Sequence, residues 1–230
     1  MGKKPHPALA AIRTAFPQTI PVLTGYLVLG IAYGVLMQTK GYGVPWVLLM
    51  CCLAYCGSMQ FVAITLLTTA FDPIQAFLMS LMVNARHLFY GVSMLGKYRG
   101  LGAAKGVLIY TLSDETFSIV SSVEPPADVP KKGFYLAVSL LNYGYWAAGS
   151  VLGAVAGRFI TFDTTGLDFA LTGLFVVLFI EQVKNPRNRM SGVIGLVCSA
   201  AALAVFGADN LVIPAMVLIL AVLLIGRKKL

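Results

Sequence analysis

Long apolar stretches separated by short polar clusters run along most of the 230 residues. A helix needs about 20 mostly apolar residues to cross the hydrocarbon core of a bilayer, and windows of this size recur along the chain. The windows that we expect to be membrane segments are 18–37, 44–70, 74–95, 106–122, 133–157, 168–183, 190–206 and 211–226. The pattern predicts an all-α, polytopic integral membrane protein, a helical bundle with about six to eight membrane segments.

The composition supports this fold class. Hydrophobic residues make up 58% of the chain and charged residues 11%, and the mean hydropathy is +0.84. A soluble domain carries about 25% charged residues, because its surface must be covered with them. No linker is long enough to separate soluble domains, so we expect a single membrane transport domain over residues 1–230, with residues 1–16 as a retained cytoplasmic tail.

The net charge of +8 is concentrated in the tail and in short loops. Cytoplasmic loops of membrane proteins collect Lys and Arg, so this excess indicates orientation. It does not indicate nucleic-acid binding, because no basic face with interleaved aromatic residues is present. The tail, the Lys131-Lys132 loop, the Lys184–Arg189 loop and the cluster Arg227–Lys229 are all predicted to be cytoplasmic, and both termini with them.

One loop conflicts with this orientation. If the windows 44–70 and 74–95 each crossed the membrane once, Lys97, Arg99 and Lys105 would face outward, against the positive-inside rule. A plain eight-span arrangement accepts this violated loop. Re-entrant or broken helices at 44–70 and 106–122 would remove the violation. Each window would then begin and end on one side of the membrane, and the loop with Lys97, Arg99 and Lys105 would be cytoplasmic.

Local features of these two windows favour the re-entrant arrangement. The first is overlong and is interrupted at Gly57-Ser58, and the second is short and contains Asp114-Glu115. Non-helical backbone at membrane depth is tolerated only where protein or a water-filled cavity surrounds it. Broken helices of this kind commonly build the substrate sites of transporters.

Small residues at helical spacing give a packing signal. Gly149, Gly153 and Gly157 repeat every fourth position, as do Gly30 and Gly34. Such residues allow two helix backbones to approach closely. They could pack within the chain or dock a partner subunit.

A polar arc interrupts the apolar window 74–95. Asn84, His87 and Gly91 share one helical face, and Arg86 lies beside it with Tyr90. Ionisable residues in membrane segments are costly and usually functional. Arg86 could bind a carboxylate in bidentate fashion, or reach a headgroup or a structural carboxylate. His87 could titrate near neutral pH and couple transport to protons.

An acidic stripe lies within the window 106–122. On a continuous helix Thr111, Asp114, Glu115, Ser118 and Ser122 would share one face. Interfacial helices favour basic polar faces, so an acidic stripe fits a water-filled pathway better. The acid pair could hold an ammonium group, exchange protons, or form an ion pair with Arg86.

A third polar interruption lies at Tyr55–Phe61. A helix that begins at Gly57-Ser58 would direct free N–H groups at an anion, and Gln60 brings an amide into the apolar interior. The candidate substrate-binding or coupling residues are therefore Gly57, Ser58, Gln60, Phe61, Asn84, Arg86, His87, Asp114 and Glu115.

No metal, cofactor or catalytic set is expected. Two histidines and four cysteines without the paired spacing of zinc ligands do not indicate a metal site. The motifs of soluble hydrolases, nucleotide-binding proteins and zinc proteases are missing, so we do not expect an enzyme.

The three polar interruptions, in this order, resemble the AzlC family of branched-chain amino-acid exporters. The resemblance rests on four motifs, densest within residues 16–120: Gly30-Ile31-Ala32-Tyr33-Gly34, Gly57-Ser58-Met59-Gln60-Phe61, Val83-Asn84-Ala85-Arg86-His87-Leu88-Phe89-Tyr90-Gly91 and Ser113-Asp114-Glu115-Thr116-Phe117.

The resemblance implies export of leucine, isoleucine, valine and methionine across the bacterial cytoplasmic membrane. It also implies secondary transport driven by the proton gradient, and a separate small hydrophobic subunit of the AzlD type. We expect the substrate carboxylate at Gly57-Ser58 or Arg86, the ammonium group facing Asp114 and Glu115, and the side chain against residues such as Phe61. The alternatives are a transporter of another small solute, or a non-transporting channel or scaffold subunit.

Overall fold

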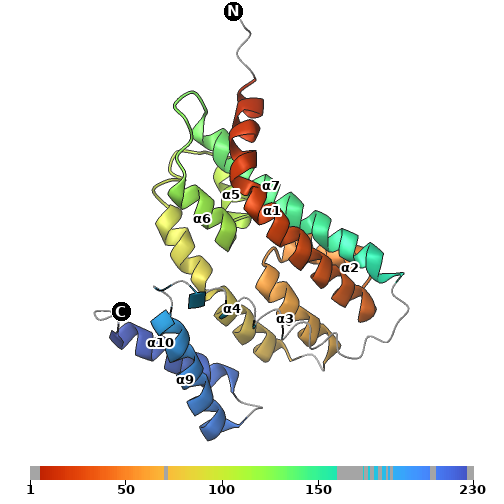
Figure 1. Ribbon diagram of the computed structural model, residues 1–230, viewed down its shortest axis with the longest axis vertical. Helices are drawn as coiled ribbons and strands as arrows, with labels where there is room; N and C mark the ends of the chain where they lie inside the picture. The colour runs from red at the N-terminus through yellow and green to blue at the C-terminus, as the bar shows by residue number, and fades with distance from the viewer. Residues whose placement is uncertain are drawn as a thin grey trace, which may run out of the picture. The chain divides into compact units, whose positions relative to one another are not determined.

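The computed structural model describes residues 6–69, 72–159, 189–207 and 211–226, with isolated positions between 173 and 186, and every element in these parts is a helix (Figure 1). The chain divides into two compact units, residues 1–163 and 164–230. The first unit contains α1 (Pro7–Thr39), α2 (Val44–Leu53), α3 (Gly57–Thr68), α4 (Pro73–Met94), α5 (Ala104–Tyr110), α6 (Asp114–Ser122) and α7 (Lys131–Gly157). The second contains α9 (Arg189–Phe206) and α10 (Val212–Gly226).

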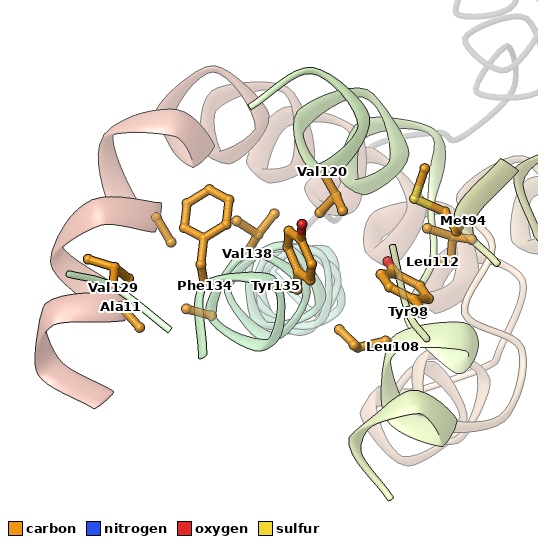
Figure 2. Close-up of a cluster of buried hydrophobic side chains, with 12 residues drawn as sticks. Ala11, Met94, Tyr98, Leu108, Leu112, Val120, Val129, Phe134, Tyr135 and Val138 are labelled. Atoms are coloured by element: carbon orange, nitrogen blue, oxygen red, sulfur yellow. The ribbon is translucent and has the colours of Figure 1, made fainter. Parts of the chain in front are cut away.

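The helices follow most of the predicted apolar windows closely. Among the described residues, α1 and α9 are long and apolar enough to cross a membrane. Most of the window 168–183, half of the Lys184–Arg189 loop and the whole cluster at 227–229 lie outside the described residues. The helix α1 begins at Pro7, so it contains the predicted window 18–37 and extends beyond it toward the N-terminus. Proline suits the first turn of a helix, and the following turns of α1 place Ala11 (Figure 2) and Ala15 in an apolar cluster.

The helices α1 and α7 run parallel and form the scaffold of the first unit (Figure 1). Near their starts Ala11 lies against Gly133, and near their ends Gln38 lies against Gly157. Between these points the backbones nearly touch: a Cβ atom on Gly34 would lie 2.0 Å from the carbonyl oxygen of Ser150. The glycine pattern is therefore used for packing within the chain.

The window 44–70 is a broken hairpin. The helix α2 ends at Leu53, three residues follow without helical structure, and α3 begins at Gly57. The hydroxyl of Tyr42, just before α2, donates a hydrogen bond of 2.8 Å to the carbonyl of Leu67, near the end of α3. The hairpin therefore begins and ends at the same end of the bundle.

The window 106–122 is a second broken hairpin. The helix α5 ends at Tyr110 and α6 begins at Asp114. Lys97, which precedes α5, donates hydrogen bonds to the carbonyls of Val120 (2.7 Å) and Ser121 (3.0 Å) near the end of α6. The single continuous helix that would place Thr111 on the acidic face is wrong, because the backbone stops being helical there and Ser113 starts a new helix.

The two hairpins enter from opposite ends of the bundle. The second begins at the end where α1 and α7 start, since Met94 and Tyr98 share an apolar cluster with Ala11 and Phe134 (Figure 2). We call this the basic end, because it carries six of the described cations of the first unit: Arg13, Lys97, Arg99, Lys105, Lys131 and Lys132. Two others, Lys40 and Arg158, follow α1 and α7 at the opposite end. The first hairpin begins at the other end, beyond Thr39. This arrangement removes the conflict over Lys97, which lies at the same end as Lys131.

The tips of the two hairpins meet inside the first unit, where the hydroxyl of Tyr110 donates to the carbonyl of Cys52. A repeat of 57 residues underlies this geometry. The helices α2 and α5 end 57 residues apart, and α3 and α6 begin 57 residues apart. Tyr33-Gly34-Val35 of α1 recurs at the same spacing as Tyr90-Gly91-Val92 of α4. The segments α1–α3 and α4–α6 thus form two copies with opposite direction through the bundle.

Candidate functional site

Two helix N-termini lie at the tips of the hairpins. The helix α3 begins at Gly57, and no side chain caps its start. The helix α6 begins at Asp114, and the side chain of Ser113 accepts a hydrogen bond of 3.2 Å from the backbone N–H of Thr116. The first N–H groups of a helix lack partners within it and carry partial positive charge. Both tips can therefore interact with anions.

Arg86 of α4 connects the two N-termini. Its Nη2 donates a hydrogen bond of 2.7 Å to Ser58 Oγ on α3, and its Nη1 lies 3.1 Å from Asp114 Oδ2 on α6. The side chains of Arg86 and Asp114 are 43% and 37% exposed, so the pair is accessible. Of the open alternatives for Arg86, an ion pair with the acidic stripe is the one observed. The other oxygen of Asp114, Oδ1, has no hydrogen-bond partner and can accept a donor.

Glu115 is held from the other side by α1. The hydroxyl of Tyr26 contacts a carboxylate oxygen of Glu115 and lies 2.9 Å from Ser113 Oγ. Tyr26 is buried. Hydrogen bonds to an ionised group are stronger than those between neutral groups, so this contact fixes the start of α6 against α1.

Gln60 and Phe61 lie in the core behind the start of α3. Trp146 of α7 donates a hydrogen bond of 2.6 Å to Gln60 Oε1, and the buried Phe61 packs edge-on against the rings of Trp146 and Tyr33. Gly57 is in contact with the same indole, since a Cβ atom there would lie 3.0 Å from its Cη2. In this structure Phe61 is covered by protein and not open to a substrate side chain.

Asn84 and His87 are separate from the Arg86 contacts. The amide of Asn84 donates to Ser80 Oγ, one turn earlier on α4, at 3.5 Å. The ring of His87 packs edge-on against Tyr90, and its Nδ1 has no hydrogen-bond partner. The structure thus brings together Ser58, Arg86 and Asp114, with Glu115 adjacent.

Two residues of α7 contribute more than the sequence indicated. Asn142 and Trp146 are an amide and an aromatic side chain in an apolar helix, a setting in which such residues usually serve packing. Asn142 donates a hydrogen bond of 3.0 Å to Thr116 Oγ1 on α6, and Trp146 donates to Gln60 on α3. The two residues are four positions apart and therefore lie on one face of α7. This spacing is the signal in the sequence that could have identified them as partners of the hairpin tips.

The site can hold opposite charges side by side. The guanidinium of Arg86 and the N–H groups of α3 suit an anion, and the carboxylates at the start of α6 suit a cation. Within the described residues no group of three or more His, Cys, Asp or Glu could hold a metal ion.

The fold and this site define a polytopic, all-α integral membrane protein with two discontinuous helical hairpins. The model of the AzlC protein family matches residues 21–160, and the chain belongs to this family. It is 48% identical to the branched-chain amino acid transport protein AzlC of Bacillus subtilis (strain 168), over 96% of this chain and 87% of that protein.

Two further relatives match over most of their length. An uncharacterized membrane protein of Helicobacter pylori (strain ATCC 700392 / 26695) is 38% identical, over 98% of this chain and 99% of its own. The inner membrane protein YgaZ of Escherichia coli (strain K12) is 23% identical, over 87% and 81%. No solved structure matches the chain. The family expected from the sequence motifs is thus confirmed.

Proposed function

We propose that this protein exports branched-chain and other hydrophobic amino acids across the bacterial cytoplasmic membrane, as the large subunit of a two-component secondary transporter. The relative from Bacillus subtilis is named for transport of branched-chain amino acids. The observation that carries the proposal is the meeting of Arg86, the start of α3 and the acidic start of α6 at the hairpin tips. We assign no enzymatic role.

The charge distribution of the site matches a zwitterion. The substrate carboxylate binds the guanidinium of Arg86 and the N–H groups at Gly57-Ser58, where it replaces Asp114 as the partner of Arg86. The ammonium group then binds the carboxylates of Asp114 and Glu115. Because the native ion pair is partly exposed, its opening costs less than that of a fully buried pair.

Three groups are candidates for coupling to the proton gradient. Asp114 and Glu115 can each exchange their charge for a proton when the substrate ammonium leaves. His87 is the third candidate, since its Nδ1 has no hydrogen-bond partner.

The basic end faces the cytoplasm in this proposal. The positive-inside rule favours this orientation, because six cations of the first unit lie at that end. The N-terminus is then cytoplasmic, and we place the C-terminus on the same side. The two units together form one transport domain, which works with a separate AzlD-type subunit.

The experiment is uptake of labelled leucine into inside-out membrane vesicles that contain this chain, with and without a co-expressed AzlD-type subunit. Saturable uptake that needs the small subunit and stops when the proton gradient is collapsed supports a two-component exporter. Vesicles without the chain provide the background rate.

Two other outcomes would reject the proposal. Saturable, gradient-driven uptake of a different amino acid or of a weak acid, without leucine uptake, would indicate a transporter of another solute. Absence of any accumulation, with both proteins present in the membrane, would indicate a channel or scaffold.

A further inference from the structure

A cavity of about 240 Å³ lies between α4 and α5 on the basic side of Arg86. Most of its wall is apolar, with Met94 from α4, Ile109 from α5 and Leu112 from the break after α5. Gly91 forms part of the α4 wall, and no atom lies within 4 Å of the position that a Cβ atom would take there. The space beside Gly91 is therefore open.

Polar atoms without partners also belong to this cavity. Tyr98, in the turn after α4, is 1% exposed and its hydroxyl has no hydrogen-bond partner. Figure 2 places its ring beside Met94 and Leu112, which line the same cavity. His87 contributes its unpartnered Nδ1. Buried polar groups normally have partners, so these two unpaired groups show that the wall of the cavity is not wholly apolar.

Tyr98 acts as a neutral group in this setting. Burial, and to a smaller degree the nearby Tyr135, raises the pKa of Tyr98 to about 12. Its hydroxyl therefore stays protonated at neutral pH and can donate a hydrogen bond.

Two residues of the cavity wall are close in sequence to the residues of the ion pair. His87 follows Arg86 on α4, and Leu112 precedes Asp114 by two residues. Gly91 lies five residues beyond Arg86, an axial distance of about 7.5 Å at 1.5 Å per residue. This distance is similar to the length of a leucine molecule. A ligand whose charged groups bind at Arg86 and Asp114 can therefore extend its side chain toward Gly91.

We propose that this cavity binds the branched side chain of the substrate and determines which amino acids the protein accepts. The inference rests on the proposed function, since it assigns the side-chain subsite of the same transport site. Met94, Ile109 and Leu112 provide apolar contact, and Gly91 leaves the room that a leucine side chain needs.

The test is Gly91→Val, assayed as uptake of labelled leucine and labelled valine into inside-out vesicles. We expect the leucine KM to rise roughly tenfold relative to the valine KM, because a pocket that loses room for one methylene discriminates by about this factor. The matched control is Gly144→Val on α7, an exposed glycine that also has no atom within 4 Å of its Cβ position. It should change neither KM.

The outcomes separate this inference from the proposed function. A wild-type protein that does not transport leucine contradicts the function. If the wild type transports leucine but the ratio of leucine KM to valine KM is unchanged in Gly91→Val, the cavity is not the side-chain subsite. A lipid chain would then be its occupant. Should Gly91→Val not reach the membrane, Ile109→Ala makes the reverse test: phenylalanine should compete better with leucine, and no gain in competition would overturn the inference.

Discussion

The two hairpins have the same backbone plan and different chemistry. Each is broken at its tip, and the helices after the breaks begin 57 residues apart. The start of α3 has no charged side chain and no side-chain cap, and it is backed by Trp146. The start of α6 is capped by Ser113 and carries Asp114 and Glu115 in its first turn.

This difference explains how a repeated fold can bind an asymmetric ligand. Two identical N-termini would both attract anions. In this chain the carboxylates at α6 reverse the preference of one N-terminus, and Arg86 reinforces the preference of the other by its hydrogen bond to Ser58. The repeat thus supplies the geometry, and a few substitutions within it give the site a negative and a positive side.

The largest expected effect comes from removal of the charges that distinguish the two tips. Arg86→Gln and Asp114→Asn should each lower leucine transport at least roughly 100-fold, since charge-assisted contacts to the substrate are lost. The double variant should remain inactive. Recovery of transport in the double variant would show that the pair is only structural. Asp128→Asn, an exposed carboxylate of the loop before α7, is the control and should transport normally.

A smaller effect is expected from the contact between α1 and α6. Tyr26→Phe removes the hydroxyl that contacts Glu115 and Ser113, and a hydrogen bond to a charged group contributes about 1.5–3 kcal/mol. Transport should fall roughly tenfold or more. The control is Tyr33→Phe, seven residues later on α1, because the buried hydroxyl of Tyr33 has no partner. Equal losses in the two variants would contradict a specific role for the Tyr26 contact.

The next comparison concerns stability at the two tips. Trp146→Phe leaves the fully buried Gln60 without its donor and should lower the free energy of unfolding by about 1–3 kcal/mol. Asn142→Leu should cost less, because Thr116 Oγ1 keeps a second donor in Ser113. Denaturant unfolding of the purified protein in detergent measures both. A larger loss for Asn142→Leu would show that the tip of α6 depends more on α7 than we infer.

The smallest effect concerns the base of the second hairpin. Lys131 and Lys97 bind Glu124 at 2.9 and 3.0 Å and lower its pKa, mainly through their hydrogen bonds. A depressed folded-state pKa contributes stability above the ordinary Glu value of about 4.3, and the contribution is lost as the pH falls through the lower folded value. Glu124→Gln should therefore lower the thermal midpoint slightly and equally at pH 8 and pH 6.

At a pH below that of the Glu124 transition, wild type and Glu124→Gln should have the same midpoint. A difference that grows as the medium becomes more acidic would contradict the sign of the effect. The first hairpin should not respond to this substitution, because Glu124 and its two lysine partners all lie at the base of the second hairpin.

Much of the helical architecture could be predicted from hydrophobic windows alone, because length and apolarity determine whether a helix can cross a bilayer. The break in 44–70 was indicated by Gly57-Ser58, although the non-helical residues are 54–56 and Gly57 begins α3. A re-entrant or broken helix was expected at 106–122, but no glycine or proline marked the break at Thr111–Ser113, so its polar residues were placed on one continuous helical face. The recurrence of Tyr-Gly-Val at a spacing of 57 was the signal that could have found it.

The pairing of Arg86 with Asp114 was one of several alternatives, since a charge at membrane depth needs a partner but the sequence does not name it. Tyr26, Asn142 and Trp146 were harder to identify as parts of the site. Aromatic and amide side chains in apolar helices are usually packing residues, and only the folded chain shows that α1 and α7 direct them at the hairpin tips.

The central claim is that the two hairpins re-enter from opposite ends and meet at one site. The most direct test is labelling of single cysteines at Thr69, Lys97 and Lys132 with a membrane-impermeant maleimide, in a chain whose four native cysteines are replaced by serine. Intact cells and inside-out vesicles expose opposite faces to the reagent. The account predicts that Lys97→Cys labels on the same face as Lys132→Cys, and Thr69→Cys on the other. Labelling of Thr69→Cys together with Lys132→Cys, and of Lys97→Cys on the opposite face, would mean that both segments simply cross the membrane and would contradict the account.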